Sequence, residues 1–336
     1  MPAPHTFELT LDVDNETFRK WRDKVKNKKK YNKDREKDYS LTEHGVTVWY
    51  PKKEFKKAIK VIVNPSRLLG FDDVVYLWEP KKKNIAEMLL ELEKHINDYF
   101  DSDYDIGDFR LTRFDVTSDL RLGYNDKVAA HIKVLYNIRK VKGFSPKYDK
   151  DDEDWYDTAL SFDLIGNSNG IEFTAYDKES VLKLNKSELR RKDMEKRIWR
   201  SEGVLRCEVK LTTQKAIRTY TDEDDTVKRI IELSEKSSRI FSNTFCTVVP
   251  YGDLYKKEQA VEIIEEKVPD KKMRAKMIKL LELIPVKKSL YLAIKEMNDR
   301  KIRHILSAFM SIGVSPVTIS KRQNNKHLRS LYKYVT

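Results

Sequence analysis

The sequence predicts an α+β protein with a mixed, mostly antiparallel central sheet, helices on one face of that sheet, and a helical C-terminal region. Segments that alternate apolar and polar residues recur up to about residue 213, with helical stretches between them. After that point the strand pattern fades, and helix-like segments are separated by Pro269, Pro285 and Gly313. Strands followed by a run of helices favour this fold class. We therefore expect two domains, over residues 1–215 and 216–336.

Local patterns place the elements of the first domain. Asn64–Pro65 ends a strand, Asn84 is expected to cap a helix, and Gly166–Gly170 is typical of a hairpin turn. The expected strands cover residues 7–13, 45–50, 57–63, 111–119, 158–165, 171–178 and 204–211. The expected helices cover residues 15–30, 84–99, 125–138 and 187–200. We expect the face of the sheet that the helices leave open to carry the functional site.

The second domain is expected to be built from helices. They cover residues 222–235, 256–267, 270–283, 290–298 and 299–312. A tight turn at Asn298–Asp299 joins the last two, and this pair could form a helix-turn-helix. Helical pairs of this kind are common, so the pattern has little specificity.

Composition points to a polyanionic partner. The chain has 336 residues and a net charge of +13, and nucleic acid is the usual partner of such a protein. A cationic surface that serves only solubility is the alternative. The basic run Lys28, Lys29 and Lys30 predicts either contact with a DNA backbone or a solvated helix face.

The cysteines and the N-terminus indicate a cytoplasmic protein. Cys207 and Cys246 are expected as buried free thiols in apolar, strand-like surroundings, because no zinc-binding spacing is present. The N-terminus lacks the apolar core of a signal peptide, and no apolar run is long enough to span a bilayer. We expect no membrane partner.

Three of the expected strands carry polar residues on one face when they are read with a period of two. The three sets are Arg113, Asp115 and Asp119; Glu172, Thr174, Tyr176 and Lys178; and Arg206, Glu208 and Lys210. If these strands are neighbours, two carboxylates, a tyrosine and a lysine converge on one surface. That set suits metal-assisted attack of a phenolate on a phosphodiester.

Tyr176 and Lys178 are the candidates for the chemical step. A tyrosine on a strand is ordinarily a packing residue, but Tyr176 is expected on the polar face with Lys178 beside it. The ammonium group could lower the pKa of the phenol or stabilise charge that develops on a phosphate.

Asp115 and Glu208 are expected in the middle of strands, where an unpaired carboxylate would be costly. One interpretation pairs them with Arg113 and Arg206 in structural salt bridges. The other gives them a hard divalent cation such as Mg²⁺, which keeps positions open for water and phosphate oxygens. The scattered histidines, and the lack of a phosphate-binding glycine loop or a G-x-S-x-G motif, disfavour zinc-nuclease, kinase and hydrolase functions.

Four short segments in order, 61–70, 112–115, 175–179 and 205–211, resemble those of a known family, with fainter similarity over 291–319. The sequence resembles the rolling-circle replication initiators of filamentous phages and, more distantly, the trans-acting replication initiators of small Gram-positive plasmids. In that family the tyrosine of the Tyr-x-Lys segment cleaves DNA, which implies Tyr176. The resemblance also implies that Asp115 and Glu208 hold the metal, Mg²⁺ or Mn²⁺. The paired histidines of better-known initiators are missing, so metal binding would rest on carboxylates.

The resemblance implies a metal-dependent, site-specific DNA endonuclease and transesterase. Tyr176 would form a 5′-phosphotyrosyl link, with Lys178 stabilising charge and Arg113 and Arg206 contacting phosphate or orienting carboxylates. Residues 1–215 would form the DNA-nicking domain and residues 216–336 a DNA-binding or accessory domain. The partners would be double- and single-stranded origin DNA and a host helicase and polymerase, in the cytoplasm of a bacterial cell.

Two other functions fit the sequence. A non-enzymatic DNA-binding regulator that uses the helix pair over 289–312 would explain the charge equally well. It would not explain the polar strand face that carries Tyr176. A conjugative relaxase-type nickase would use similar chemistry at a transfer origin.

Overall fold

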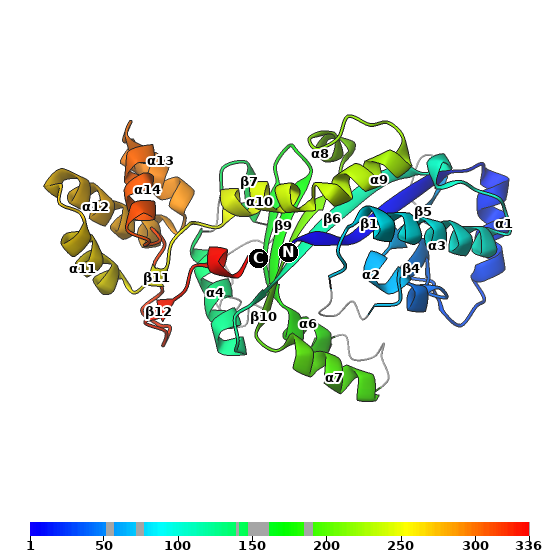
Figure 1. Ribbon diagram of the computed structural model, residues 1–336, viewed down its shortest axis with the longest axis horizontal. Coiled ribbons are helices and arrows are strands. Elements are labelled where there is room, and N and C mark those ends of the chain that lie inside the picture. Colours follow the sequence, from blue (N-terminus) through cyan, green and yellow to red (C-terminus); the bar gives the residue numbers. More distant parts are fainter. Residues whose placement is uncertain (52–56, 72–76, 139–140, 147–160, 185–190, 336) are drawn as a thin grey trace. The chain divides into compact units, whose positions relative to one another are not determined.

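The computed structural model describes residues 1–51, 57–71, 77–138, 141–146, 161–184 and 191–335 (Figure 1). The predicted fold class is confirmed: a large sheet with helices around it precedes a helical C-terminal region. None of the helices in the described ranges combines the length and the apolar character needed to cross a membrane.

The main sheet has ten strands in the order β2-β3-β4-β5-β1-β6-β10-β9-β8-β7, and a small second sheet pairs β11 with β12. The strands of the main sheet are β1 (Ala3–Asp12), β2 (Tyr31–Asn32), β3 (Lys37–Asp38), β4 (Val46–Trp49), β5 (Ala58–Val63), β6 (Arg110–Arg121), β7 (Phe144–Pro146), β8 (Ser161–Gly166), β9 (Ile171–Asp177) and β10 (Val204–Leu211). The small sheet consists of β11 (Leu254–Tyr255) and β12 (His327–Leu328). The pairs β2–β3, β3–β4, β4–β5, β5–β1, β1–β6, β7–β8 and β8–β9 are antiparallel, as predicted.

The helices of the first part of the chain are α1 (Asn15–Val25), α2 (Pro65–Leu68), α3 (Lys82–Phe100), α4 (Asn125–Ile138), α6 (Lys178–Leu184), α7 (Arg191–Ser201) and α8 (Gln214–Arg218). Those that follow are α9 (Thr226–Glu235), α10 (Ser237–Val248), α11 (Lys257–Lys267), α12 (Lys271–Lys287), α13 (Leu290–Met297) and α14 (Ile302–Ser311). Short 3₁₀ turns are η1 (Thr42–His44), η2 (Ile106–Asp108) and η4 (Leu331–Tyr334).

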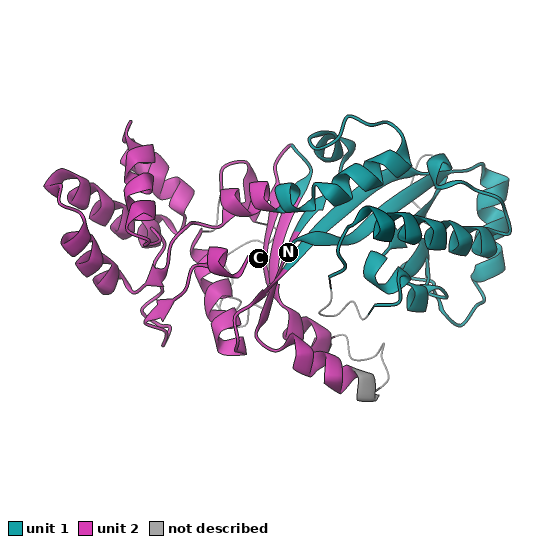
Figure 2. Ribbon diagram, viewed as in Figure 1, with its two compact units in different colours: residues 1–118, 169–171, 209–241 teal, residues 119–168, 172–208, 242–336 magenta. Residues whose placement is uncertain are grey.

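The chain divides into two compact units that do not follow chain order (Figure 2). Unit 1 contains residues 1–118, 169–171 and 209–241, and unit 2 contains residues 119–168, 172–208 and 242–336. Compactness does not assign functions to residues. The predicted division into a nicking domain over 1–215 and an accessory domain over 216–336 therefore stays a prediction.

In unit 1 the sheet has one apolar face and one polar face. Along β4 and β5, Val46, Val48, Val61 and Val63 are buried, while the residues between them are partly exposed. The buried face follows from the alternation of the sequence, because successive side chains of a strand point to opposite sides. Helices α3 and α9 contact each other, and rings of α1 and α3 pack together at Trp21 and Phe100.

In unit 2 the C-terminal helices α11 to α14 share a core built around buried residues such as Ile264, Leu280, Ile305 and Phe309. The predicted helix pair is present as α13 and α14, with Asn298 in the left-handed conformation between them. Helix α12 continues past Pro285 to Lys287, although the sequence predicted a stop near 283. Proline in the last turn costs a backbone hydrogen bond without ending the helix at once.

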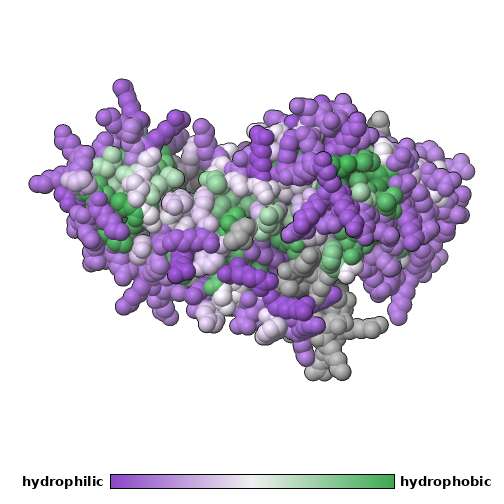
Figure 3. Space-filling model, viewed as in Figure 1, coloured by the Kyte–Doolittle hydropathy of each residue, from purple (hydrophilic) through white to green (hydrophobic). Residues whose placement is uncertain are grey.

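Hydrophilic side chains dominate the surface in both units. Figure 3 shows one face of the molecule, on which hydrophobic residues are visible only in patches between long stretches of hydrophilic ones. This agrees with a chain in which 36% of the residues are charged. The apolar side chains are concentrated in the cores described above, as expected for a globular protein.

Several predicted details were wrong. Cys246 lies in helix α10 and is exposed, not buried in a strand, whereas Cys207 is a buried free thiol of β10. Asn84 lies inside α3, whose N-cap position is Lys81. Helix α1 ends at Val25, so the basic run at 28–30 lies in the turns after it. Residues 158–160 of the strand expected over 158–165, and residues 187–190 of the helix expected over 187–200, lie outside the described residues.

Candidate active site

Tyr176 and Glu208 meet across neighbouring strands of unit 2. The Tyr176 hydroxyl on β9 donates a hydrogen bond of 2.7 Å to Glu208 Oε1 on β10. Glu208 is buried and Tyr176 is partly buried. The pKa of the phenol is raised well above its ordinary value. Burial is the largest cause, and the charge of Glu208 is the next. Tyr176 is therefore a protonated phenol at neutral pH, and its proton already points at a carboxylate.

A buried ion pair lies beside this hydrogen bond. Arg206 Nε donates to Asp119 Oδ1 at 2.6 Å, and Nη2 donates to Oδ2 at 2.7 Å. Arg206 has no exposed surface. Burial disfavours its charge, but the Asp119 carboxylate outweighs burial, so the pKa of Arg206 is raised and the guanidinium stays charged. That positive charge lowers the pKa of Tyr176, against the larger effects of burial and Glu208.

Local structure explains why these side chains meet. The β8–β9 hairpin pairs Ser161 with Tyr176 and buries Phe173 and Ala175 on the opposite side of β9. Gly203 precedes β10 with a φ of +65°, and a Cβ there would lie 2.5 Å from the carbonyl carbon of Gly123. This close approach needs glycine. It fixes the start of β10 against the end of β6.

Lys178 does not share the strand face with Tyr176. It is buried and is the first residue of α6, because Asp177 ends the strand and caps the helix. Asp177 Oδ1 accepts from the backbone N–H of Glu179 at 3.0 Å, and Oδ2 accepts from the Ser180 hydroxyl at 2.7 Å. A capping carboxylate of this kind forces the change from strand to helix. The positive charge that acts on Tyr176 is that of Arg206.

Asp115 forms a salt bridge with Arg113, which was one of the two interpretations of the sequence. Arg113 Nε donates to Asp115 Oδ1 at 2.8 Å, and Arg113 Nη2 donates to Asp115 Oδ2. Asp115 is only 1% exposed. Asp115 and Arg113 belong to unit 1, whereas Glu208 belongs to unit 2.

The two carboxylates of the predicted metal site accept hydrogen bonds from other side chains. Both oxygens of Asp115 accept hydrogen bonds from Arg113, and an oxygen of Glu208 accepts one from Tyr176. Across the described ranges, no group of three or more histidine, cysteine, aspartate or glutamate side chains is arranged to hold a metal ion. Glu208 fits the role of a carboxylate ligand beside the phenol, since Mg²⁺ is often bound by one or two carboxylates and substrate phosphates.

The predicted DNA contacts have different surroundings. Arg206 is fully buried against Asp119, so orientation of charge suits it better than phosphate contact. Lys28 Nζ lies 3.9 Å from an Asp38 oxygen, and Lys30 Nζ lies 3.7 Å from a Glu43 oxygen. Lys29 is exposed.

Asp119 is the residue of this cluster to which sequence reasoning gave no role. Its place on the polar face with Arg113 and Asp115 was predicted, but the salt-bridge interpretation of the sequence paired Arg206 with Glu208. The buried bidentate pair with Arg206 shows why a carboxylate is needed at this position of β6. The signal in the sequence that could have predicted this pair is the presence of opposite charges on the same face of neighbouring strands.

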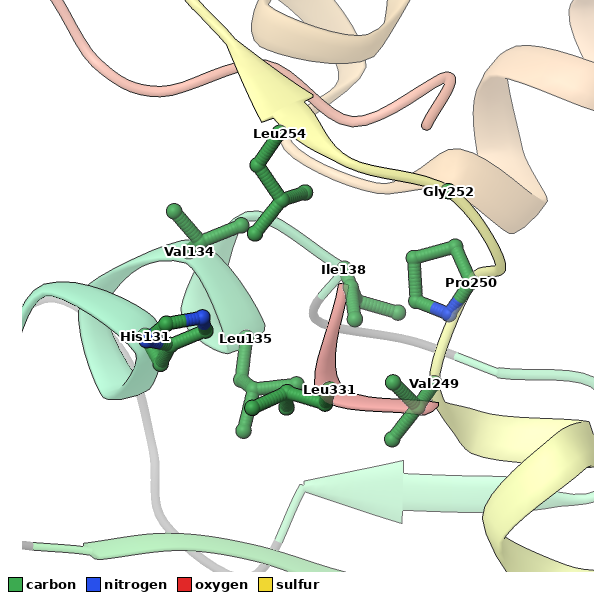
Figure 4. Close-up of a pocket in the computed structure, with 9 residues that line it drawn as sticks. All are labelled: His131, Val134, Leu135, Ile138, Val249, Pro250, Gly252, Leu254 and Leu331. Atoms are coloured by element: carbon green, nitrogen blue, oxygen red, sulfur yellow. The ribbon is translucent and has the colours of Figure 1, made fainter. Parts of the chain in front are cut away.

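A small pocket in unit 2 is not the candidate site. Its lining is almost entirely apolar and includes Val134, Leu135 and Leu331 (Figure 4). His131, at its edge, has Nδ1 2.8 Å from the Lys127 carbonyl oxygen and Nε2 3.0 Å from that of Arg329. Burial lowers the pKa of this imidazole. The imidazole lies between the backbone of α4 and that of the C-terminal segment.

Comparison with protein-family models and with curated proteins gives no match. Among solved structures, the chain is similar to a rolling-circle replication initiator protein from Geobacillus stearothermophilus, at 12% sequence identity and a TM-score of 0.32. The similarity covers 95% of this chain and 98% of that chain. Because a TM-score this low does not establish a common fold, the functional assignment depends on the residues of the site.

Proposed function

We propose that this chain nicks and rejoins one DNA strand at a replication origin through a tyrosyl-DNA intermediate, and so starts rolling-circle replication. The observation that carries the chemistry is the 2.7 Å hydrogen bond from Tyr176 to Glu208 beside the buried Arg206–Asp119 pair. The net charge of +13 suits a polyanionic substrate. The role in replication comes from the resemblance of the motif segments to rolling-circle initiators.

The first step follows from this arrangement. The Tyr176 oxygen attacks a phosphorus atom as its proton passes to Glu208, so a Tyr–O–P bond forms and the P–O3′ bond of the DNA breaks. Arg206 stabilises the negative charge that develops on the phenol oxygen, and Asp119 holds the guanidinium in place. The departing 3′ oxygen takes up a proton, so the transesterification is balanced without an external energy source.

The second step is the reverse of the first. A free 3′-OH attacks the phosphotyrosine, the DNA backbone is restored, and the phenol recovers a proton. Between the two steps a host polymerase extends the 3′-OH and a host helicase unwinds the duplex. Rejoining then releases a circular single strand.

We propose that Mg²⁺ or Mn²⁺ takes part and that Glu208 holds it. Such an ion would polarise the scissile phosphodiester. If Asp115 is also a ligand, the guanidinium of Arg113 competes with the ion for its two oxygens. Calorimetric titration with Mn²⁺ tests this directly. If Asp115 is a ligand, Arg113→Ala binds Mn²⁺ more tightly than the wild type and Asp115→Asn binds it more weakly. Equal affinities in all three proteins would remove Asp115 from the site.

The overall proposal is tested on the supercoiled DNA of the replicon that encodes the chain. With Mg²⁺ we expect open circles that carry protein covalently on a 5′ end and have a 3′-OH that a polymerase extends. Tyr176→Phe should give neither product. Nicks without attached protein, or full nicking by Tyr176→Phe, would contradict the proposal.

A second candidate is a non-enzymatic DNA-binding regulator, which the α13–α14 helix pair favours. It predicts sequence-specific duplex binding with no nick at any metal concentration. Loss of that binding on substitution of exposed Arg303 in α14, with Tyr176→Phe fully functional, would support it. A relaxase-type nickase would differ from the main proposal only in cleaving a transfer origin.

A further inference from the structure

The polar face of the sheet in unit 1 carries a row of side chains unrelated to the tyrosine site. Along β4 and β5, the partly exposed residues are Thr47, Trp49, Lys60 and Ile62. The strand pairing places Lys37 opposite Trp49 and Trp49 opposite Lys60. Directly paired residues of neighbouring strands lie on the same side of a sheet. The row therefore reads Lys37–Trp49–Lys60 across β3, β4 and β5.

The indole of Trp49 is flanked by both ammonium groups. Lys37 Nζ lies 5.1 Å and Lys60 Nζ lies 4.9 Å from the centre of the ring. Lys60 also lies 3.3 Å from Glu8 Oε1. Cation–π contacts at partly exposed sites are weak. The ammonium groups can therefore exchange the ring for an anionic ligand at small cost.

Two arginines, Arg35 and Arg113, also act on Lys37 of this row. Burial lowers the pKa of Lys37, and although Glu8 acts in the opposite direction, Arg35 and Arg113 add to the lowering. The charge of Arg113 is offset by Asp115 and that of Lys60 by Glu8. The charges of Lys37 and Arg35 then give this face of the sheet a net positive charge. An anion that approached Lys37 would relieve the repulsion that lowers its pKa.

We propose that this face, the Lys37–Trp49–Lys60 platform, binds single-stranded nucleic acid. An unstacked base would stack on Trp49 while Lys37 turns to a neighbouring phosphate. Aromatic rings on a sheet, combined with flanking cations, bind single strands with little sequence preference. A duplex cannot use the ring, because its bases are already stacked. The choice of DNA over RNA rests on the proposed function, in which a single strand is displaced at the origin.

The test uses the full chain and a short fluorescein-labelled oligo(dT), with the anisotropy of the label as the readout. Trp49→Ala should weaken binding about tenfold, as expected for the loss of one stacked base. Trp49→Phe should keep most of the affinity. Lys37→Gln should lower the slope of log K against log salt concentration by about 0.7, the value for one phosphate contact on a single strand. Tryptophan fluorescence should be quenched on binding in the wild type and much less in Trp49→Phe.

Matched controls distinguish binding at Trp49 from binding elsewhere on the protein. Trp199, which is 72% exposed on α7, provides a tryptophan that is not part of the row, and Trp199→Ala should bind like the wild type. Duplex of the same sequence should bind Trp49→Ala as well as it binds the wild type. Unchanged single-strand affinity in Trp49→Ala, or an equal loss on duplex, would overturn the proposal. If Trp49→Ala unfolds, the proposal is still tested by the quenching measurement on Trp49→Phe and the salt slope of Lys37→Gln.

The outcome is independent of the nicking chemistry. Binding of oligo(dT) is measured without Mg²⁺ and needs no tyrosyl adduct, so it does not depend on cleavage. If no tyrosyl adduct ever forms but Trp49 is needed for binding, the platform stands and the proposed function fails. If the adduct forms and Trp49→Ala binds normally, the platform fails and the proposed function stands.

Discussion

Tyr176 in unit 2 and Tyr99 in unit 1 form the same hydrogen bond in different electrostatic surroundings. Tyr176 donates to Glu208 at 2.7 Å, and Tyr99 donates to Asp38 at 2.8 Å. Both tyrosines are partly buried, and burial is the largest cause of the raised pKa of each. A hydrogen bond from a buried phenol to a carboxylate is therefore not enough to identify a nucleophile.

The difference is the charge that acts on each ring. Arg206 lowers the pKa of Tyr176. The neighbours that shift the pKa of Tyr99 all raise it, a second phenol first and then Asp38. Lys28 Nζ lies over the face of the Tyr99 ring, 5.4 Å from its centre. A phenol becomes a usable nucleophile when its proton has an acceptor and its phenolate has a stabilising cation. The cation near Tyr99 is the half-exposed Lys28, whereas the Arg206 that acts on Tyr176 is fully buried.

Removing the two hydroxyl groups gives the largest expected contrast. Tyr176→Phe should abolish strand cleavage, because no other group replaces the attacking oxygen. Tyr99→Phe should cleave at the wild-type rate. Both are measured as the rate of nicking of supercoiled DNA, with circular dichroism as the check on folding. Equal rates in the two variants would remove the distinction between the sites.

Neutralising the two proton acceptors should give the next largest effect. Glu208→Gln should slow cleavage by about 10²–10⁴-fold, the usual contribution of a general base. Asp38→Asn keeps the shape of the other carboxylate and should leave the rate unchanged. Single-turnover kinetics with a radiolabelled substrate separate the chemical step from binding. A normal single-turnover rate in Glu208→Gln would show that the proton goes elsewhere.

The ion pairs near the two tyrosines should differ in their effect on stability. Arg206→Gln leaves Asp119 buried without its partner and should lower the free energy of unfolding by about 3–5 kcal/mol. The pair of Lys28 and Asp38 is half exposed on the lysine side, and Lys28→Gln should cost less than about 1 kcal/mol. Urea titration measures both.

Replacing both members of the buried pair separates stability from chemistry. The double variant Arg206→Met with Asp119→Leu should recover much of the stability lost in Arg206→Gln, since a buried ion pair can be replaced by apolar residues. It should still nick slowly, because the phenolate has lost its cation. A stable double variant that nicks at the wild-type rate would show that Arg206 has only a structural role.

The smallest effect is one that the two tyrosines should share. The folded pKa of each phenol lies above the unfolded value of about 10. Above that pH the unfolded chain loses a proton that the folded chain keeps, so stability is fully present below about pH 10 and falls as the pH rises. Relative to the wild type, the free energy of unfolding of Tyr176→Phe and of Tyr99→Phe should each increase by about 1.4 kcal/mol per pH unit above pH 10. Urea titrations at two alkaline pH values measure this slope, and a flat difference would contradict the raised pKa.

The strands could be predicted because their signals are local. Alternation in 171–177 and the turn at 166–170 were enough to place Tyr176 on the polar side of β9. Lys178 was misplaced because the same alternation was extended past Asp177, which caps a helix. Reading Asp177 as an N-cap would have moved the lysine off the strand.

The partners of the charged residues could not be predicted, because they depend on register between strands distant in the sequence. Arg113 and Asp115 lie two residues apart, so their pairing was among the alternatives. The pairing of Arg206 with Asp119 depends on how β10 aligns with β6, which Gly203 fixes. The exposure of Cys246 was missed for a related reason, since helix α10 was not recognised.

The most direct measurement is peptide mapping of the protein–DNA adduct. The protein is incubated with its replicon DNA and Mg²⁺, the product is digested with nuclease and trypsin, and the nucleotide-bearing peptide is sequenced by mass spectrometry. We predict a nucleotide on the phenol oxygen of Tyr176 in the wild type and no modified peptide in Tyr176→Phe. A nucleotide on Tyr99 or any other residue, with Tyr176 unmodified, would contradict the account.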